Sequence, residues 1–577
     1  MCILYRNLIG FYFTINNTHK GGKIRFHIIN MTKKGLLYKK GMKIAMFSKK
    51  DPRQKWFRGG EDIQYTLNKD SNTSKPLYIL SFTHEFLYDD DTISIAFSEP
   101  YTITDLKRDL NKVSKTIGRK CLFNREALCT TIGGTTCELI TLTSTKYRKE
   151  SKKAIIITAR VHPGETVGSW MTKGILEFLT SNNYIAEILL DRYVFKIIPC
   201  LNPDGVIQGN YRCSLSGSDL NRKYIHPSSV LHPSIYYLKA MVKRIGIPVA
   251  FYCDLHGHSK KKDVFAYGNT CEGASEEYRL FPFILSKLNP LFSYKSSKFS
   301  VNKSKASTAR VAMWRELKIP TVYTIEASFY GATESNEHFT SKDLILMGHS
   351  ICQALLVYRQ IRGEESKVNL TIKRVAEEIK REFENNEKAL LEGSDSGSDS
   401  NPPENEADLN EIVKKITNSE TKSIKEEDFD QLLENSQNTI PTTTFNKNEK
   451  KEMVKNFIMG SVKPLNEATL KGQTTRGRSI RTEVRQNKRL EIARFRQSNK
   501  VMLKIVPICF STKSSQISRN KPSNLYSFFD GSNIWKASSY NRYFFNLRYK
   551  KLKQDIFSKT QDNLNPNEYM IVTFIYN

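Results

Sequence analysis

Short apolar runs separated by polar turn residues fill the chain up to about residue 98. The runs KIRFHIIN, MKIAMFS, DIQYTLN, LYILSF and TISIAFS are rich in β-branched and aromatic residues. Each run is typical of a strand, and several short strands in close succession are typical of an antiparallel sandwich. Residues 1–98 are therefore expected to form a small antiparallel β-sandwich domain.

The pattern changes after the segment PYTITDL, where apolar strand-like runs begin to alternate with helical stretches. This alternation predicts an α/β domain, with a mixed, mostly parallel sheet and helices on both faces. The runs AIIITARV, YVFKIIPCL, PVAFYCDL and TVYTIEASF have continuous β-branched and aromatic content, as strands buried on both faces of a sheet require. We expect this domain to span residues 99–364.

Apolar positions become sparse beyond residue 364. Residues 366–392 have the pattern of a charged helix, and the following stretch GSDSGSDSNPPENEADLNE contains too few apolar residues to fold. The extension 365–577 is therefore expected to be charged and mostly disordered. Residues 391–440 hold 13 acidic and 4 basic side chains, whereas residues 471–560 hold 21 basic and 4 acidic ones.

The formal net charge of +30 favours acidic partners, which include acidic protein tails, anionic membranes and nucleic acid. The basic tail could bind nucleic acid through its cations and aromatic rings. The favoured interpretation of this tail is, however, a mostly disordered extension whose charges are solvated. The ten cysteines form no CxxC pair, which favours a reduced, intracellular protein. Neither a signal peptide nor a membrane span is expected, because no stretch has the required pattern.

Candidate metal ligands follow the ends of the predicted buried strands. His162 and Glu165 come directly after AIIITAR, and the Pro-Gly pair between them makes a turn that can aim both side chains at one point. His256 ends the run PVAFYCDL, with His258 as an alternative. Ligands of open α/β sheets bind beyond the carboxyl ends of the strands. Two histidines and one glutamate suit a catalytic zinc ion, which keeps a fourth position for water.

Further polar residues have the chemistry of a hydrolase that binds carboxylates. Glu326 lies inside the apolar run TVYTIEASF, where it is either part of a buried salt bridge or the general base that activates water. Arg212, and Arg222 beside Asn221, offer guanidinium groups for a carboxylate or an oxyanion. Asp219 could accept the second ring N–H of a ligand histidine.

Several motifs together resemble the zinc metallocarboxypeptidases. They are HPGETVGSWMTKGIL, NPDGVIQGNYRCSLSGSDLNR, CDLHGHS, and STARVAMWREL followed by TIEASFYG. Within this family they are most similar to the cytosolic carboxypeptidase branch, which trims glutamates from proteins, notably tubulin. GMKIAMFS, WFRGGEDIQYT and SEPYTITDL in the upstream domain also resemble this branch. The resemblance covers about residues 10–360.

The resemblance implies roles for the residues at the matching positions. It implies one zinc ion per chain, bound by His162, Glu165 and His256, and thereby selects His256 over His258. It also implies that Glu326 is the general base and that Arg212 polarises the scissile carbonyl.

The resemblance further implies that Asn221 and Arg222 clamp the terminal carboxylate of the substrate, with Asp219 as the partner of the first zinc histidine. Arg310 is the candidate for a positive group in the specificity pocket, since the branch prefers acidic terminal side chains. Digestive relatives carry a mobile tyrosine upstream of the base, and the corresponding stretch VNKSKASTAR contains none.

The expected function is removal of C-terminal or side-chain-linked glutamates from acidic protein tails, with tubulin as the favoured substrate. The expected location is the cytoplasm, with the cytoskeleton or the cilium as candidate sites of association. Two alternatives remain. One is a zinc-dependent N-acyl amino acid deacylase of the aspartoacylase type, and the other is a non-catalytic protein that binds microtubules or nucleic acid.

Overall fold

The computed structural model describes residues 10–69, 71, 75–116, 121–270, 277–364 and 370–392. These residues form two compact units, one of residues up to 102 together with 204–218, and one of residues 103–203 and 219–392. The domain boundaries at residues 98 and 364 stay a prediction. The part of the extension from residue 393 onward, for which disorder is expected, lies outside the described residues.

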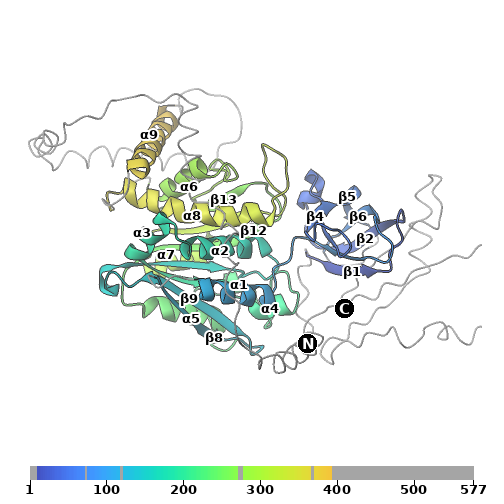
Figure 1. Ribbon diagram of the computed structural model, residues 1–577, viewed down its shortest axis with the longest axis horizontal. Helices are drawn as coiled ribbons and strands as arrows, with labels where there is room; N and C mark the ends of the chain where they lie inside the picture. Colours follow the sequence, from blue (N-terminus) through green and yellow to red (C-terminus); the bar gives the residue numbers. More distant parts are fainter. Residues whose placement is uncertain are drawn as a thin grey trace, which may run out of the picture. The chain divides into compact units, whose positions relative to one another are not determined.

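The first unit consists of two antiparallel sheets with the strand orders β1-β7-β3-β4 and β2-β6-β5 (Figure 1). The sheets meet through aromatic side chains, because the ring of Phe13 in β1 lies 5.9 Å from that of Phe26 in β2. The predicted antiparallel sandwich is therefore confirmed. Tyr211 packs edge-on against Phe97 at 6.0 Å, which ties the segment 204–218 to this unit. The elements are β1 Tyr12–Asn16, β2 Lys23–Met31, η1 Leu37–Lys40, β3 Ile44–Ser48, β4 Phe57–Gly59, β5 Glu61–Asn68, β6 Leu77–Glu85 and β7 Thr92–Ala96.

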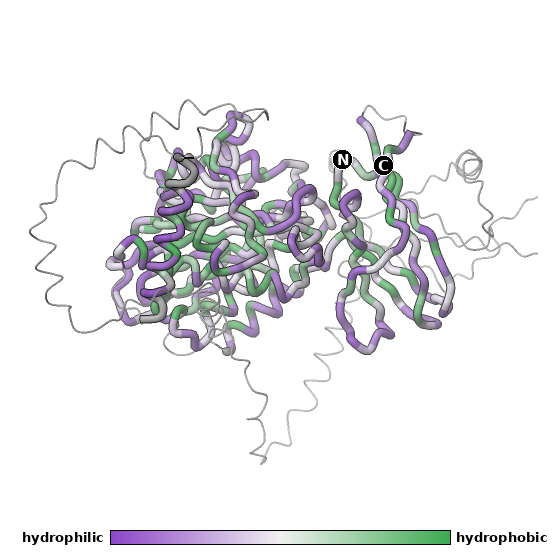
Figure 2. The backbone as a smooth tube through the Cα atoms, turned by 90° about the horizontal axis from the view of Figure 1, so that it is seen from above, coloured by the Kyte–Doolittle hydropathy of each residue, from purple (hydrophilic) through white to green (hydrophobic). Residues whose placement is uncertain are grey.

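A seven-stranded mixed sheet with the order β13-β14-β12-β10-β11-β9-β8 forms the centre of the second unit. The four strands β14, β12, β10 and β11 are parallel, and the strands at both edges are antiparallel. The apolar runs of the sequence form these parallel strands. Figure 2 shows hydrophobic stretches of the chain in the interior of this unit. The predicted mixed α/β sheet is thus confirmed, with its parallel part limited to the central strands. The strands are β8 Cys121–Thr130, β9 Thr136–Ser144, β10 Lys153–Ala159, β11 Tyr193–Ile198, β12 Val249–His258, β13 Val264–Tyr267 and β14 Val322–Ser328.

Helices cover both faces of this sheet. Tyr252 of β12 joins a buried apolar cluster with α5 and α7, whereas Leu255, which points to the opposite face, contacts Gly168 of α2. Helix α8 lies against α2 so closely that a Cβ on Gly174 would collide with the backbone of Ile345. The helices of the described chain are α1 Ile103–Thr116, η2 Lys149–Ser151, α2 Thr166–Leu179, α3 Tyr184–Arg192, α4 Pro203–Ile207, η3 Leu220–Arg222, α5 Pro233–Lys243, α6 Glu277–Leu288, η4 Lys303–Lys305, α7 Ala309–Leu317, α8 Ser341–Ile361 and α9 Leu370–Glu392.

Two long helices bear on the sequence predictions. Helix α8 is, within the described residues, the one helix long and apolar enough to cross a membrane, but 61% of its apolar window is buried in the unit, as in a core helix. Helix α9 is the charged helix expected for residues 366–392. It packs on α6, because the ring of Phe383 lies 5.2 Å from that of Phe283 and Glu382 pairs with Lys287.

Candidate metal centre

The turn that follows β10 carries two of the predicted ligands and is held by a buried arginine. His162 lies in this turn and Glu165 directly precedes α2. Arg160 adopts a left-handed φ of 55°, and its guanidinium donates to the carbonyl oxygen of Pro163 at 2.6 and 2.9 Å and to Oγ of Ser169 at 2.8 Å. A non-glycine residue in this region is strained, so these bonds are needed to keep the turn in shape.

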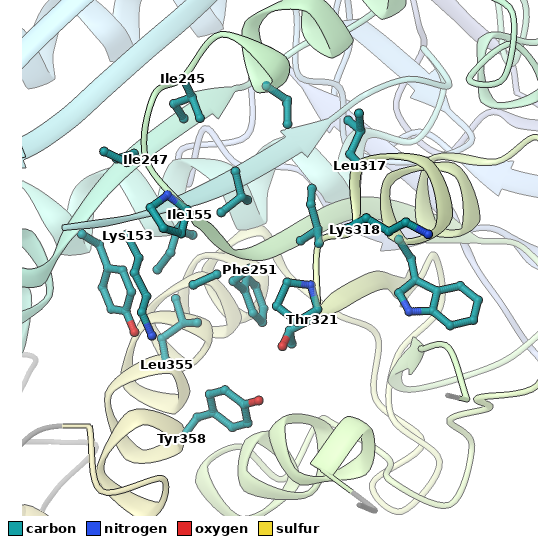
Figure 3. A pocket seen from close by; sticks show the side chains of 18 of the residues that line it. Lys153, Ile155, Ile245, Ile247, Phe251, Leu317, Lys318, Thr321, Leu355 and Tyr358 are labelled. Carbon is teal, nitrogen blue, oxygen red and sulfur yellow. The ribbon is translucent and has the colours of Figure 1, made fainter. Parts of the chain in front are cut away.

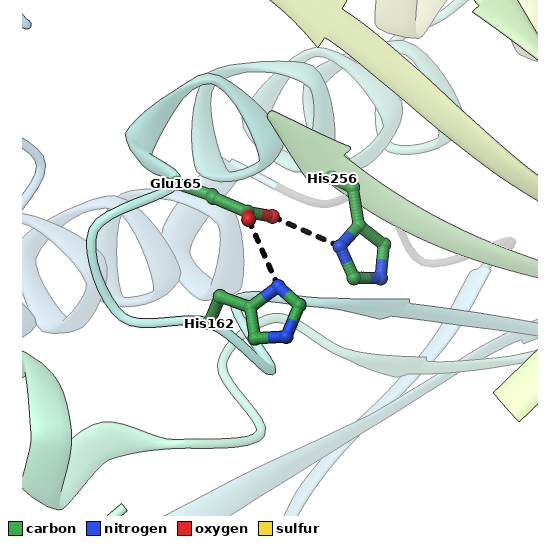
Figure 4. A group of neighbouring side chains, drawn as sticks. All are labelled: His162, Glu165 and His256. Atoms are coloured by element: carbon green, nitrogen blue, oxygen red, sulfur yellow. Dashed lines mark hydrogen bonds and ion pairs between the residues drawn. The ribbon is translucent and has the colours of Figure 1, made fainter. Parts of the chain in front are cut away.

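The structure brings His162, Glu165 and His256 together at the carboxyl ends of the parallel strands (Figure 4). Nδ1 of His162 lies 2.8 Å from Oε1 of Glu165, and Nδ1 of His256 lies 2.9 Å from Oε2. All three side chains are buried, and one ligand atom from each lies within 4.8 Å of the other two. Two imidazole nitrogens and a carboxylate oxygen fit the donor set of a catalytic zinc ion.

An aspartate accepts a hydrogen bond from the outer nitrogen of each histidine. Nε2 of His162 lies 3.1 Å from Oδ1 of Asp219, and Nε2 of His256 lies 2.8 Å from Oδ2 of Asp254. Such partners fix which ring nitrogen faces a metal. Asp219 is one of the predicted residues, whereas Asp254 was missed. Asp254 could have been found from its spacing, because it lies two residues before His256 and residues two apart in a strand point to the same face.

The charges of the centre are mutually dependent in the metal-free protein. Burial alone would lower the pKa of His256, but the carboxylates of Asp254 and Glu165 raise it well above its usual value. Burial alone would raise the pKa of Glu165, but the two histidines hold it well below the usual range. Metal binding to histidine ligands releases protons in general, so zinc affinity at this centre should depend on pH.

Glu326 lies directly beside the three ligands. It belongs to β14 and is the neighbour of His256 in the parallel pairing of β12 with β14. Its Oε2 is buried and has no hydrogen-bond partner, and among the described residues Glu326 forms no ion pair. Burial raises its pKa to about 7, with His256 opposing and Glu165 adding to the shift. A carboxyl group with a pKa near neutrality can both accept and deliver a proton.

The predicted carboxylate clamp lies in η3, next to Asp219. Oδ1 of Asn221 accepts from the backbone N–H of Ala309 at 2.9 Å, which leaves the amide NH2 group for a ligand. Oδ1 of Asp219 accepts from the backbone N–H of Asn221 at 3.0 Å, so the clamp and the partner of His162 share one turn. Arg222 is partly exposed and donates to the carbonyl oxygen of Asn221 at 2.8 Å.

Arg310, at the start of α7, is a buried cation. Its guanidinium donates to the carbonyl oxygen of Gly268 and to Oδ1 of Asn269 at 2.7 Å, and within the described chain it pairs with no carboxylate. Burial lowers its pKa to about 10, with Tyr267 opposing. Tyr267, which the sequence analysis did not single out, ends β13, and its pKa is raised to about 12 by burial and by Glu326.

Arg212, the remaining predicted residue, belongs to the segment 204–218 of the first unit, and its role stays a prediction. A cavity of about 990 Å³ opens at the amino ends of the parallel strands, among Lys153, Ile155, Phe251 and Thr321 (Figure 3). It lies at the opposite edge of the sheet from the metal ligands. None of the predicted site residues lines this cavity, so its size does not make it the candidate site.

Comparison with known families identifies the class of this fold and site. Residues 122–345 match the family described as zinc carboxypeptidase, and this stretch contains all three candidate ligands and Glu326. This part of the chain belongs to the zinc carboxypeptidase family. The family expected from the motifs is therefore confirmed, and zinc is the metal that this family uses.

Individual relatives are cytosolic carboxypeptidases. The chain is 43% identical to cytosolic carboxypeptidase 2 of Xenopus tropicalis over 388 residues, which are 64% of this chain and 40% of that protein. It is 42% identical to human cytosolic carboxypeptidase 2 over 362 residues, or 60% of this chain and 40% of that protein. The alignment with cytosolic carboxypeptidase 2 of Danio rerio, at 40% identity, covers 68% of this chain and 57% of that protein. The chain spans less than two thirds of the length of these relatives.

Solved bacterial structures share the fold. The metallo-carboxypeptidase from Burkholderia cenocepacia superimposes with a TM-score of 0.51 at 21% identity, over 61% of this chain and 89% of that one. A metallo-carboxypeptidase from Pseudomonas aeruginosa gives a TM-score of 0.50 at 20% identity, over 62% and 91%. At this level of identity the two structures show the common fold alone.

Proposed function

We propose that the protein is a zinc-dependent metallocarboxypeptidase that removes C-terminal or side-chain-linked glutamates from acidic protein tails. The observation that carries this proposal is the convergence of His162, Glu165 and His256 on one point, directly beside the unpaired carboxyl group of Glu326. These residues lie in a zinc carboxypeptidase domain. The relatives are named cytosolic carboxypeptidases, which supports a cytoplasmic location.

In this proposal each residue of the centre has one task. Zn²⁺ held by the two histidines and Glu165 supplies Lewis acidity and lowers the pKa of a water molecule. Glu326, which lies beside the ligand His256, would accept the proton of the attacking water and deliver it to the leaving amine. Asp219 and Asp254 hold the ring nitrogens in the orientation that ligation requires.

The clamp explains why only a terminal residue would be removed. Asn221 and Arg222 bind the free α-carboxylate of the substrate, and Arg212 polarises the scissile carbonyl group. The bond between Asn221 and Ala309 supports this role, because it fixes the amide with its NH2 group free to donate. An internal peptide bond has no free carboxylate, so the buried NH2 group of Asn221 would stay without a partner.

Arg310 accounts for the preference for glutamate. Its guanidinium is buried, and among the described residues only neutral oxygens accept its hydrogen bonds. A buried cation that lacks a counter-ion is costly, so the side-chain carboxylate of the substrate would complete the pocket. Tubulin, whose tails are acidic, is the substrate that we favour, and the net charge of +30 would attract such a tail.

A direct test uses a polyglutamylated tubulin peptide and mass spectrometry. We expect the purified full chain to release glutamates one at a time, and a zinc chelator to stop the reaction. A Glu326→Gln variant should lose about 10²- to 10⁴-fold in rate, because the amide cannot take the proton. Cleavage of N-acyl aspartate without release of glutamate would instead support the deacylase. Wild-type cellular effects in the Glu326→Gln variant would support the non-catalytic alternative.

A further inference from the structure

A lysine that has no role in the steps above lies at the rim of the same site. Lys261 is in the turn that follows β12, and its Nζ lies 4.8 Å from the centre of the Phe265 ring. Phe265 in β13 is directly opposite Glu326 in β14. Side chains of directly opposed residues project from the same face of a sheet. The ammonium group of Lys261 therefore lies on the side of the sheet that carries the general base.

Neighbouring groups hold Lys261 in place without neutralising its charge. Its backbone N–H donates to Nδ1 of His258 at 3.0 Å, and the ring of His258 packs against Phe265 at 5.2 Å. Nζ donates to the carbonyl oxygen of Ser296 at 3.5 Å. An aromatic face and a carbonyl dipole both attract a cation, and neither cancels it.

A second lysine adds to the positive potential. Lys298 is exposed, and its backbone N–H donates to the carbonyl oxygen of Ala266, next to Phe265. Burial lowers the pKa of Lys261, the charge of Lys298 lowers it further, and Glu326 opposes both. Across the part of the chain that the structure describes, neither lysine forms an ion pair with a carboxylate. The charge of Lys298 acts unfavourably on that of Lys261, and an anion bound between them would relieve this repulsion.

We propose that Lys261, with Lys298, binds the side-chain carboxylate of the residue that precedes the terminal glutamate of the substrate. This inference rests on the proposed carboxypeptidase function and adds a residue, Lys261, that would select for an acidic side chain before the terminal glutamate. The clamp and Arg310 account for the two carboxylates of the terminal residue. The scissile amide joins that residue to the preceding one, so the side chain of the preceding residue is the next acidic group along the substrate and would lie on the same side of the sheet as Glu326 and Lys261.

The test compares two peptides that differ only in the residue before the terminal glutamate, which is glutamate in one and glutamine in the other. We expect the zinc-loaded full chain to cleave the Glu-Glu peptide about 10-fold more efficiently in kcat/KM, as a charge-assisted hydrogen bond implies. Lys261→Met keeps the aliphatic stem on Phe265 and should abolish this preference, because its kcat/KM should fall more for the Glu-Glu peptide than for the Gln-Glu peptide. Lys261→Arg should retain most of the preference.

The control variant is Lys295→Met, which removes the same charge from an exposed position in the neighbouring loop. It should leave the ratio between the two peptides as in the wild type. An unchanged ratio in Lys261→Met, or an equal loss on both peptides, would overturn the inference. Activity on the Gln-Glu peptide also reports that the variant is folded. If the wild type cleaves neither peptide, the carboxypeptidase function itself fails, and the subsite fails with it.

Discussion

Replacement of Asp254 by asparagine tests how the metal centre is oriented. Asp254 is fully buried and uses both carboxylate oxygens. Oδ2 accepts from Nε2 of His256 at 2.8 Å, and Oδ1 accepts from the hydroxyl of Thr158 at 2.7 Å. Asparagine has one oxygen and no charge. Its NH2 group faces either Nε2 of His256, which would lose its acceptor, or the hydroxyl of Thr158, which can accept if it donates its own proton to Tyr252. In either orientation we expect the variant to lose the charge-assisted hydrogen bond that holds the tautomer of His256.

The size of the effect follows from this geometry. A buried donor left without its partner costs about 1–3 kcal/mol. Because each 1.4 kcal/mol is a factor of ten in an equilibrium constant, the predicted loss of zinc affinity is roughly 5- to 150-fold. Partners of ligand histidines are typically worth about 10- to 100-fold in metal affinity, so the two estimates agree.

The assay is titration of the metal-free protein with Zn²⁺ in competition with a chelator of known affinity. Asp219→Asn is the matched control, because its carboxylate is 21% exposed and lies 3.1 Å from Nε2 of His162. Water can replace part of that contact, so we expect a smaller loss than for Asp254→Asn. An affinity of Asp254→Asn within threefold of the wild type, with the fold intact by circular dichroism, would refute the reasoning.

Three further predictions concern specificity, the ligand turn and pH. Arg310→Met should lower kcat/KM for a peptide with a terminal glutamate about 10-fold more than for a peptide with a terminal leucine, because only the glutamate side chain needs the cation. Equal losses of kcat/KM for the two peptides would contradict this prediction. Arg160→Ala removes the bonds to Pro163 and Ser169, so thermal unfolding should show a loss of about 2–4 kcal/mol. Burial lowers the pKa of His349 to about 4 in the folded protein, whereas the pKa of an exposed histidine in the unfolded chain is near 6.5. As the pH falls, His349 is therefore protonated in the unfolded chain before it is protonated in the folded one. The free energy of unfolding should therefore drop by about 2 kcal/mol between pH 6.5 and pH 5 because of this group. Urea unfolding at the two pH values should show a drop that is smaller by this amount in His349→Phe.

The central strands could be predicted because burial on both faces demands a continuous apolar run. Strands β10, β11, β12 and β14 each coincide with such a run. The edge strand β8 could not be found in this way, since its exposed and half-buried positions carry charged residues such as Arg125 and Glu126. The candidate ligands were also accessible from the sequence, because imidazole and carboxylate groups at several strand ends must meet at one edge of the sheet.

Residue types and their order were therefore enough to predict the mixed α/β sheet, the donor set and the candidate base, and the resemblance of the motifs to a known family added the zinc carboxypeptidase fold. The tertiary structure alone decided which groups surround them. The pairing of β12 with β14 sets Glu326 beside His256, and the pairing of β13 with β14 brings Phe265, and Lys261 with it, to the same face. A hydrogen bond or a cation–π contact depends on which segments become neighbours in space. Spacing along the chain therefore cannot reveal it unless both partners lie on one strand, as Asp254 and His256 do.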